Sequence, residues 1–393
     1  MPEEIVILGG GVGGTLTANL LDKRLPKGSA RIRVVDPTGI HVYQPGFLYV
    51  ALGRANSGWL SQSLRSLLRP DIEVVIDNAV KIDTASKKVL LERDGEISYD
   101  RLVIATGSYS DEQQVPGLRE GSYNFYSMAE AERLREALNG FKGGTILIGI
   151  AGMPYKCPPA PVEFAFLLDE MLRKKKIRDK TRIRFLSPLN RAFTIESASK
   201  MVQPLFEERG IELETFVNVD TVDPEKRELT SIEGETYSYD LAVLIPPHRP
   251  ASFVTDSGLV DKSGWLAVDP NTLEVIGQEG IYGIGDTTNL PISKSGSTAH
   301  FESPVVVEEI RRSIVDSNSD SSQSNQPAKK ASTSKLRYKG KVTCFLETGH
   351  RKATILIFNY DKPPNPPKPS IIWHLAKWFF NRIYWITVPR GRV

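Results

Sequence analysis

Hydrophobic and polar positions along the chain predict an α/β protein. Short apolar runs, typical of buried strands, alternate with longer amphipathic stretches typical of helices, such as the one from about 161 to 175. The predicted strands cover residues 5–8, 31–36, 72–76, 88–92, 100–105, 145–150, 182–186 and 241–245. This alternation predicts parallel sheets with helices packed on their faces.

The order of the elements predicts two Rossmann-like dinucleotide-binding domains, one inserted in the other. Residues 1–110 and 241–312 form the two parts of the first domain, and residues 111–240 form the second. Residues 313–336 are rich in Ser, Asn and Gln and almost free of apolar residues, which predicts a flexible loop. Residues 337–393 then add short strands, a Pro-rich spacer and an amphipathic tail.

The first predicted strand ends in a Gly-rich turn. Gly9, Gly11 and Gly14 have the spacing that lets the backbone approach a pyrophosphate at a helix N-terminus. Asp36 ends the next strand, roughly 20 residues on, where a carboxylate can accept a hydrogen bond from a ribose hydroxyl. Taken alone, the motif also fits a Gly-rich turn without a ligand.

Two later motifs strengthen this interpretation. Thr106 and Gly107 follow a strand, and Gly285 and Asp286 precede a predicted helix. An acid in that position can bond a ribityl chain while helix N–H groups meet phosphate. Three such motifs in this order favour FAD over NAD as the bound dinucleotide.

A second strand–turn–helix unit, from Thr145 to Pro161, begins like another dinucleotide motif but does not complete it. Gly149 and Gly152 are followed by Cys157 and several prolines, which stiffen the loop. Flavoproteins that take electrons from NAD(P)H need a second intact Gly-rich turn at this point. The sequence therefore predicts that one dinucleotide is bound and that the electron donor is a species that reacts with sulfur.

Composition narrows the function further. A net charge of +3 without a long basic run argues against nucleic-acid binding. Glu3 and Glu4 stand where an export signal would carry positive charge, so we expect no such signal. Cys157 and Cys344 are the two cysteines, and a bridge between them would then be reactive rather than structural. The alternative is that they are two unrelated buried thiols.

Glu163 lies near the start of the helix that follows Cys157. There it is placed to act as a general base for a sulfur nucleophile. The alternative is a solvated carboxylate that the helix dipole favours.

The tail at 371–388 combines aromatic residues with a narrow polar stripe. It holds three of the five tryptophans, and on a helix its polar residues fall on one side: His374, Lys377, Asn381 and Arg382. This pattern is typical of an interfacial helix at the headgroup level of a membrane, whereas no apolar run is long enough to span one. It predicts a peripheral, monotopic membrane protein, on the cytoplasmic face. Packing on the protein's own core or on a second copy is the alternative.

The segment Tyr155-Lys-Cys157-Pro-Pro-Ala-Pro161-Val-Glu163 resembles, almost residue for residue, the redox-cysteine loop of the sulfide:quinone oxidoreductases, in the flavoprotein disulfide reductase superfamily. The resemblance extends over nearly the whole chain. Cys344-Phe345 resembles the second redox-cysteine segment, Lys294 resembles the lysine at the flavin pyrimidine edge, and Pro45 resembles the proline beside the isoalloxazine.

This resemblance implies FAD-dependent oxidation of hydrogen sulfide to sulfur or polysulfide through a Cys157/Cys344 redox pair, with two electrons passed to a membrane quinone. Glu163 would be catalytic with the two cysteines, and Phe345 would line the quinone path. Many members have a third cysteine, to which some attach FAD, where Ser127-Met128 stand here. We therefore expect non-covalent FAD. The histidines of some family active sites have no evident counterpart, which leaves the proton relay open.

Two other functions stay open at this level. A type II NADH:quinone oxidoreductase shares the flavin, tail and quinone but needs an intact second Gly-rich turn. The other is a flavin-binding membrane protein without catalysis. The expected partners are sulfide, a quinone and a membrane surface contacted by residues 371–388. The quinone, the polysulfide length, the oligomeric state (a homo-oligomer included) and which cysteine reacts with the flavin are not determined.

Overall fold

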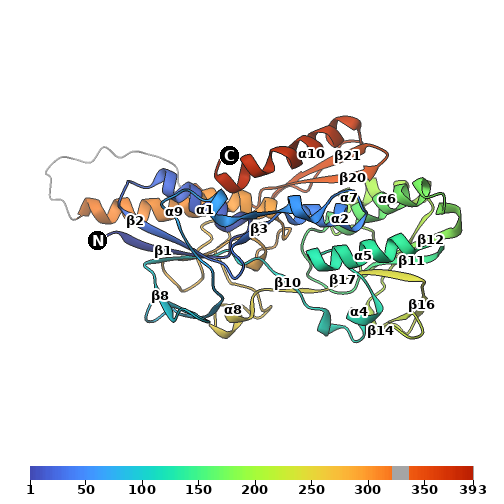
Figure 1. Ribbon diagram of the computed structural model, residues 1–393, viewed down its shortest axis with the longest axis horizontal. Coiled ribbons are helices and arrows are strands. Elements are labelled where there is room, and N and C mark those ends of the chain that lie inside the picture. The colour runs from blue at the N-terminus through green and yellow to red at the C-terminus, as the bar shows by residue number, and fades with distance from the viewer. Residues whose placement is uncertain (321–335, 393) are drawn as a thin grey trace.

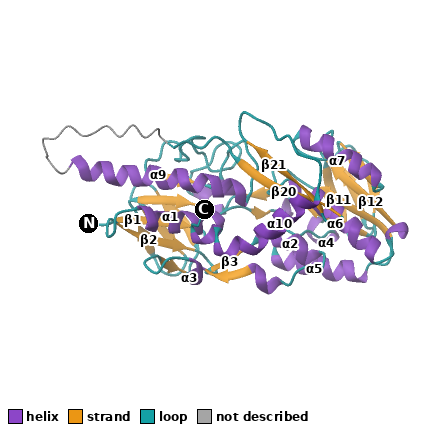
Figure 2. Cartoon of the chain, turned by 90° about the horizontal axis from the view of Figure 1, so that it is seen from above, coloured by secondary structure: helices purple, strands orange, loops and turns teal. Residues whose placement is uncertain are grey.

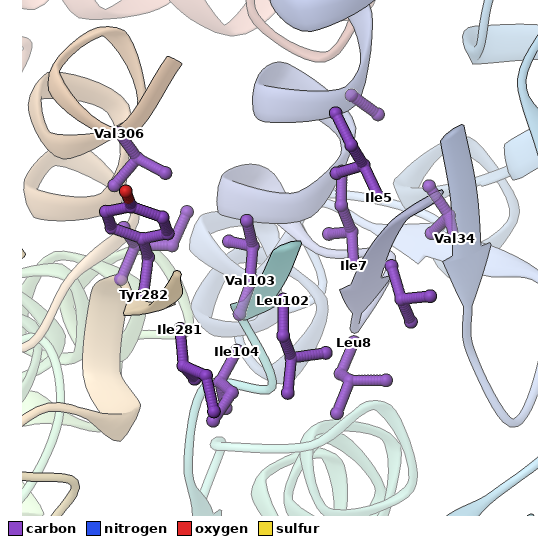
Figure 3. Close-up of a cluster of buried hydrophobic side chains, with 14 of the residues drawn as sticks. Ile5, Ile7, Leu8, Val34, Leu102, Val103, Ile104, Ile281, Tyr282 and Val306 are labelled. Carbon is purple, nitrogen blue, oxygen red and sulfur yellow. The ribbon is translucent and has the colours of Figure 1, made fainter. Parts of the chain in front are cut away.

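The computed structural model describes residues 1–320 and 336–392 (Figure 1). A five-stranded parallel sheet of order β19-β9-β1-β2-β5 forms the first domain. Its strands are β1 (Glu3–Leu8), β2 (Ala30–Val35), β5 (Glu73–Val75), β9 (Arg101–Ile104) and β19 (Ile281–Gly283). Helices α1 (Val12–Arg24) and α9 (Gly296–Asp320) pack against each other in this domain. Figure 3 shows Ile5, Ile7, Leu102, Ile104 and Ile281 in its buried core.

A second parallel sheet, of order β13-β12-β11-β17, forms the other domain. Its strands are β11 (Gly144–Ile150), β12 (Thr181–Ser187), β13 (Ile211–Thr215) and β17 (Leu241–Ile245). Its helices are α5 (Met128–Gly140), α6 (Pro159–Lys174) and α7 (Glu196–Glu208). Strand β17 pairs with β11, so the expected assignment of 241–245 to the first domain is wrong. An isolated apolar strand fits either parallel sheet, and the pairing is decided by the crossover, which local sequence does not specify.

Two three-stranded antiparallel sheets extend from these domains. One contains β6 (Ala79–Asp83), β7 (Lys88–Leu91) and β8 (Glu96–Ser98), and the other contains β14 (Val219–Asp223), β15 (Glu228–Ser231) and β16 (Thr236–Ser238). The shorter elements are β3 (Ile40–Val42), β4 (Ser61–Ser63), β10 (Tyr109–Ser110), β18 (His248–Arg249), α2 (Phe47–Ala51), α3 (Leu64–Leu67), α4 (Leu118–Gly121) and α8 (Ser252–Asp256).

The C-terminal part returns across both domains (Figure 2). Strands β20 (Val342–Gly349) and β21 (Lys352–Phe358) form a hairpin on α6, and α10 (Ile371–Ile383) packs on β21. The expected helix over 371–388 ends at Ile383 and continues as two short 3-10 turns, Tyr384–Ile386 and Val388–Arg390.

The first part of the loop expected from 313 to 336 is helical instead. Helix α9 runs on to Asp320, and residues 321–335 lie outside the described residues. The side chains of Ile310 and Ile314 are buried in the first domain's core, which extends the helix beyond the point where the composition becomes polar.

Candidate active site

The glycines of the turn after β1 differ in the space around the position of an added Cβ. Gly9 has a left-handed φ of +100°, and a Cβ on it would meet the Ala105 carbonyl oxygen at 2.6 Å. A Cβ on Gly14 would meet the Gly9 carbonyl oxygen at 1.8 Å. By contrast, a Cβ on Gly11 would have nothing within 4 Å. The turn is therefore tightly packed at its base and open at Gly11, where a phosphate can approach the N-terminus of α1.

Asp36 lies beside this turn, as the sequence predicts. Its Oδ2 accepts the Gly10 N–H at 2.8 Å, and its Oδ1 accepts the N–H groups of Thr38 and Gly39 at 2.9 Å each. The carboxylate thus fixes the turn through these hydrogen bonds.

Thr106, an expected dinucleotide residue, and three residues near the expected ones in sequence have hydroxyls that lack partners. Among the described residues, the hydroxyls of Thr106, Ser108, Thr287 and Ser293 are buried without a hydrogen-bond partner. Buried polar groups are normally paired, so these hydroxyls indicate a polar ligand. Gly107, with φ of +66°, also has nothing within 4 Å of a Cβ. These residues fit the pyrophosphate and ribityl groups of FAD.

Gly285 and Asp286 lie in a 3-10 turn before α9. The Gly285 N–H donates to Glu302 Oε2 at 2.6 Å, and Glu302 is fully buried. Burial raises the pKa of Glu302 to about 8, and burial also raises the pKa of Asp286. Two carboxyl groups beside this turn are therefore held toward their neutral forms.

Lys294 lies next to Asp286. Its Nζ donates to the carbonyl oxygens of Asp286 and Thr288 at 3.0 and 2.6 Å and lies 3.4 Å from the ring centroid of Trp265. Burial lowers the pKa of Lys294 to about 8. Trp265 shows no motif in the sequence, and its contact is found only from the structure. Pro45 is exposed in the 3-10 turn Gln44–Gly46.

The second strand–turn–helix unit packs closely on the segment after β17. A Cβ on Gly152 would meet three ring atoms of Pro247 at 2.8 to 2.9 Å. Packing against this proline therefore requires a glycine at position 152, and the sequence does not complete a Gly-rich motif beyond it.

Cys157 follows that turn, immediately before α6. It has a left-handed φ of 52°, and its N–H donates to the Lys294 carbonyl oxygen at 2.6 Å. The cysteine loop is therefore tied directly to the segment beside Asp286. A non-glycine residue in this conformation is uncommon and is held by its surroundings.

Cys344, on β20, lies close to Cys157. Both are free thiols and both pack against the same hydrophobic cluster. Burial raises the pKa of Cys157, and the charge of Cys344 raises it further. Burial raises the pKa of Cys344 to about 12, against a hydrogen bond from Ser295 that lowers it. The structure thus brings together two cysteines that lie far apart in the sequence, in a medium that disfavours thiolate.

Glu163 is buried near the start of α6 and is not solvated. It pairs with Lys377 of α10, which is 7% exposed, and Lys377 Nζ also lies 3.8 Å from Glu347 Oε2. Burial raises the pKa of Glu163 to about 7, against the lowering effect of Lys377. Burial alone would lower the pKa of Lys377, but the carboxylates of Glu163 and Glu347 outweigh it and raise that pKa.

Glu347 extends this buried network. Its Oε1 lies 2.8 Å from His374 Nδ1, and its Oε2 accepts the Tyr49 hydroxyl at 2.7 Å. Tyr49 belongs to no sequence motif, and Glu347, which follows Cys344-Phe345 in the segment resembling the second redox-cysteine loop, has no role assigned from the sequence. His374 and Lys377 were noticed as a polar stripe, but their partners lie far away in the sequence.

Three residues of the polar stripe on α10, His374, Lys377 and Asn381, face the protein, whereas Arg382 is exposed and most of the apolar side faces outward. Asn381 accepts the Tyr43 hydroxyl at 2.6 Å, in addition to the contacts of His374 and Lys377. Several large apolar side chains on α10 are exposed: Ile371, Ile372, Leu375, Trp378 and Phe379. This is the reverse of a helix packed on a globular core. Within the described part of the chain, no helix has the length and apolarity that a bilayer span requires.

Phe345 follows Cys344 on β20, and its ring lies near helix α10. Its ring centroid is 6.4 Å from that of Phe380, which is partly exposed on α10. Ser127, which stands where the resembling family has a third cysteine, caps α5 by accepting the Glu130 N–H at 3.2 Å.

The sequence matches a known protein family and curated relatives. Residues 3–303 match the family described as pyridine nucleotide-disulphide oxidoreductase. A mitochondrial sulfide:quinone oxidoreductase of Mus musculus is 28% identical over 407 residues, covering 99% of this chain and 86% of the mouse protein.

Two solved structures share the fold. The sulfide:quinone oxidoreductase from Aquifex aeolicus superposes with a TM-score of 0.84 at 22% identity, covering 99% of this chain and 92% of the other. NDH2 from Plasmodium falciparum, in complex with NADH, reaches 0.72 at 15% identity, covering 100% and 96%. The family match covers most of the chain, and the chain therefore belongs to the pyridine nucleotide-disulphide oxidoreductase family.

Proposed function

We propose that this chain oxidises sulfide and passes two electrons, through bound FAD, to a membrane quinone. One observation carries the proposal: Cys157 and Cys344 pack against the same hydrophobic cluster, with the Cys157 N–H bonded to the carbonyl oxygen of Lys294, one of the expected FAD-binding residues. The incomplete Gly-rich motif of the second turn, where Cys157 and prolines follow Gly152, favours sulfide over a nicotinamide donor. The sulfide:quinone oxidoreductases among the relatives support the same reaction.

The residues that would hold FAD are those around the open turn. Gly11 and the N-terminus of α1 would meet the pyrophosphate, and Asp36 would bond the adenosine ribose. Lys294 would supply a positive charge near the flavin ring, since its Nζ lies beside Asp286. When bound, FAD supplies the two-electron redox chemistry that links sulfur to quinone.

The sulfur step follows from the burial of the cysteines. In the oxidised enzyme, a sulfur bridge joins Cys157 and Cys344, either directly or through further sulfur. HS⁻ attacks one sulfur of this bridge, an S–S bond breaks, and one cysteine becomes a persulfide while the other leaves as thiolate. Because burial raises the pKa of both thiols, the released thiolate is poorly solvated and is driven to react. Over the cycle sulfide loses two electrons, and the quinone gains two electrons and two protons.

Proton transfer is assigned to the network of Glu163, Glu347, His374 and Lys377, which joins α6 and β20 to α10. A group with a pKa near 7 can take up and release a proton at neutral pH, and Glu163 has that property. Lys377 connects Glu163 to Glu347 and so to His374 on the outer helix. The network extends from the cysteine cluster to the helix with the exposed apolar side, where Phe345 and Phe380 would line the quinone path.

The exposed apolar side of α10 is proposed as the membrane-docking face. Trp378 and Phe379 are 48% and 57% exposed, and Ile372 is 69% exposed. Interfacial helices insert such residues below the headgroups, but here most of the polar stripe is satisfied by the protein instead of by water. The docked helix would bring a quinone from the bilayer to the buried network.

The experiment that tests this function uses Cys157→Ser and Cys344→Ser. Each variant is expected to keep its flavin, because the hydroxyl has nearly the same volume and neither cysteine belongs to the dinucleotide cradle. Each should lose sulfide-dependent bleaching of the flavin absorbance under anaerobic conditions. A wild-type bleaching rate in either variant would overturn the sulfur step.

A further inference from the structure

A basic pocket lies at the end of α1, outside the active site. It has a volume of about 310 Å³. Its walls come from α1, from the turn after α3 and from the last described residues of the chain: Asn19, Lys23, Leu67, Leu68, Arg69, Pro70, Arg390, Gly391 and Arg392. The volume is at the lower end of ligand pockets and suits a small charged group.

Asn19 fixes the three walls relative to one another. Its side-chain amide donates to the carbonyl oxygens of Leu67 at 3.1 Å and Pro389 at 2.7 Å, and its Oδ1 accepts the Arg69 N–H at 2.9 Å. Gly391, with φ of +64°, packs so closely that a Cβ there would lie 3.1 Å from Asn19 Cβ. The pocket is therefore built by specific buried contacts.

The charge of the lining is strongly positive. Lys23, Arg69, Arg390 and Arg392 line the pocket, and Asp22 pairs with Arg69. Arg390 is oriented by its Nε, which donates to the Trp385 carbonyl oxygen at 3.1 Å. Leu67, Leu68 and Pro70 add an apolar side to the same pocket. This combination favours an anion that carries an apolar part.

The pocket continues from the proposed membrane-docking face. The chain leaves α10 through Trp385 and Ile386 and then enters the pocket wall at Arg390. Ile386 is 55% exposed, and the Trp385 indole N–H donates to the carbonyl of Trp59, which is itself 38% exposed. The C-terminus, α1 and α10 lie along the same side of the molecule in Figure 1. Cations at the rim of an apolar, aromatic face are the groups that attract anionic headgroups.

We propose that this pocket binds the phosphate headgroup of an anionic phospholipid when α10 docks on a bilayer. Lys23 and Arg390 contact the phosphate, and Pro70, the exposed apolar residue of the lining, contacts the glycerol end of the lipid. The inference rests on the membrane docking proposed above, and it adds a lipid preference that docking of an apolar face alone does not give.

The test compares binding of the purified full-length holoprotein to two kinds of vesicle. One is phosphatidylcholine alone, and the other contains a minor fraction of phosphatidylglycerol. Wild type is expected to bind both and to bind the anionic vesicles more tightly. One diffuse surface cation contributes about fivefold to the binding of anionic vesicles. Arg390→Gln and Lys23→Gln should each reduce the anionic preference by clearly more than that. Both variants should leave binding to phosphatidylcholine unchanged.

Arg382→Gln is the matched control. Arg382 is exposed on α10, where it stacks 4.0 Å from the centroid of Trp378, and it lies outside the pocket. Arg382→Gln should reduce the anionic preference about fivefold or less. This reduction should disappear at high salt, where diffuse attraction is screened. The pocket variants should keep their defect at high salt.

Three results would contradict the pocket. Equal losses in Arg382→Gln and in the pocket variants would mean diffuse attraction only. Wild type that binds both vesicles equally would remove the lipid preference while leaving membrane docking intact. Wild type that binds neither vesicle would overturn the docking face and the pocket together.

Discussion

Removing the positive charge of Lys377 should destabilise the protein in a pH-dependent way. Lys377 is nine-tenths buried and pairs with Glu163, while Glu347 also has Tyr49 and His374 as partners. In Lys377→Met, therefore, Glu163 is the carboxylate that loses its main compensation. In a protein environment, two unit charges about 4 Å apart interact by about 4 kcal/mol, so Glu163 loses an interaction of that order.

The expected size of the effect follows from burial. Removing one partner of a buried ion pair costs about 3 to 5 kcal/mol of unfolding free energy when the remaining charge stays ionised. The folded-state pKa of Glu163 is already raised to about 7 by burial, and loss of Lys377 raises it further. A carboxyl group with a raised folded pKa binds more protons when folded, so its contribution to stability falls as pH rises from the unfolded pKa to the folded one.

The variant should thus be penalised most above pH 7. Because one pKa unit corresponds to about 1.4 kcal/mol and pH 8 lies about one unit above the wild-type pKa of Glu163, denaturant unfolding should show a loss larger at pH 8 than at pH 5.5 by about 1.4 kcal/mol. At pH 5.5 Glu163 is protonated in both proteins, and the loss should shrink to about 1 kcal/mol, the value of a lost hydrogen bond. Adding Glu163→Gln to Lys377→Met should restore most of the loss at pH 8. An equal loss at both pH values, or no rescue by Glu163→Gln, would refute the reasoning.

Three further predictions concern the cofactor, the proton network and the membrane. Gly11→Ala should weaken FAD binding at least about tenfold, or 1.4 kcal/mol, without loss of unfolding free energy in the apoprotein, and Gly58→Ala, also with nothing near its Cβ, should change neither. Glu163→Gln should slow sulfide-dependent flavin bleaching about 100-fold or more in stopped-flow measurements. A near wild-type rate would remove its role as base. Trp378→Ser combined with Phe379→Ser should lower binding to phosphatidylcholine vesicles at least about a hundredfold, since burial of each ring contributes about 2 kcal/mol, and unchanged binding would exclude α10 as the docking face.

The parts of the fold that the sequence predicts are those with local signals. The first strand and Gly-rich turn carry a motif in which each glycine has its own steric reason, and the structure reproduces that turn. The pairing of β17 with β11 was missed because an apolar strand carries no information on its neighbours. The end of α9 was missed because the buried Ile310 and Ile314 outweigh the polar composition that follows them.

In the candidate site, too, the sequence predicts features that have a local signal and does not predict contacts between distant residues. The proximity of Cys157 and Cys344 was expected from resemblance, whereas the ion pair between Glu163 and Lys377 joins residues 214 positions apart and has no local signal. The stripe on α10 was identified, but a stripe of polar residues fits both a water-facing and a protein-facing orientation. Only the contacts of His374, Lys377 and Asn381 show that most of it faces the protein.

The most direct measurement of the central claim is an anaerobic titration of the purified flavoprotein, followed by its flavin absorbance. Sulfide is added to one sample and NADH to another, and a quinone analogue is then added to each. The account predicts rapid bleaching by sulfide, reoxidation by the quinone analogue, and no bleaching by NADH. Bleaching by NADH with none by sulfide would mean that the turn packed by Pro247 still admits a nucleotide, and it would contradict the proposed function.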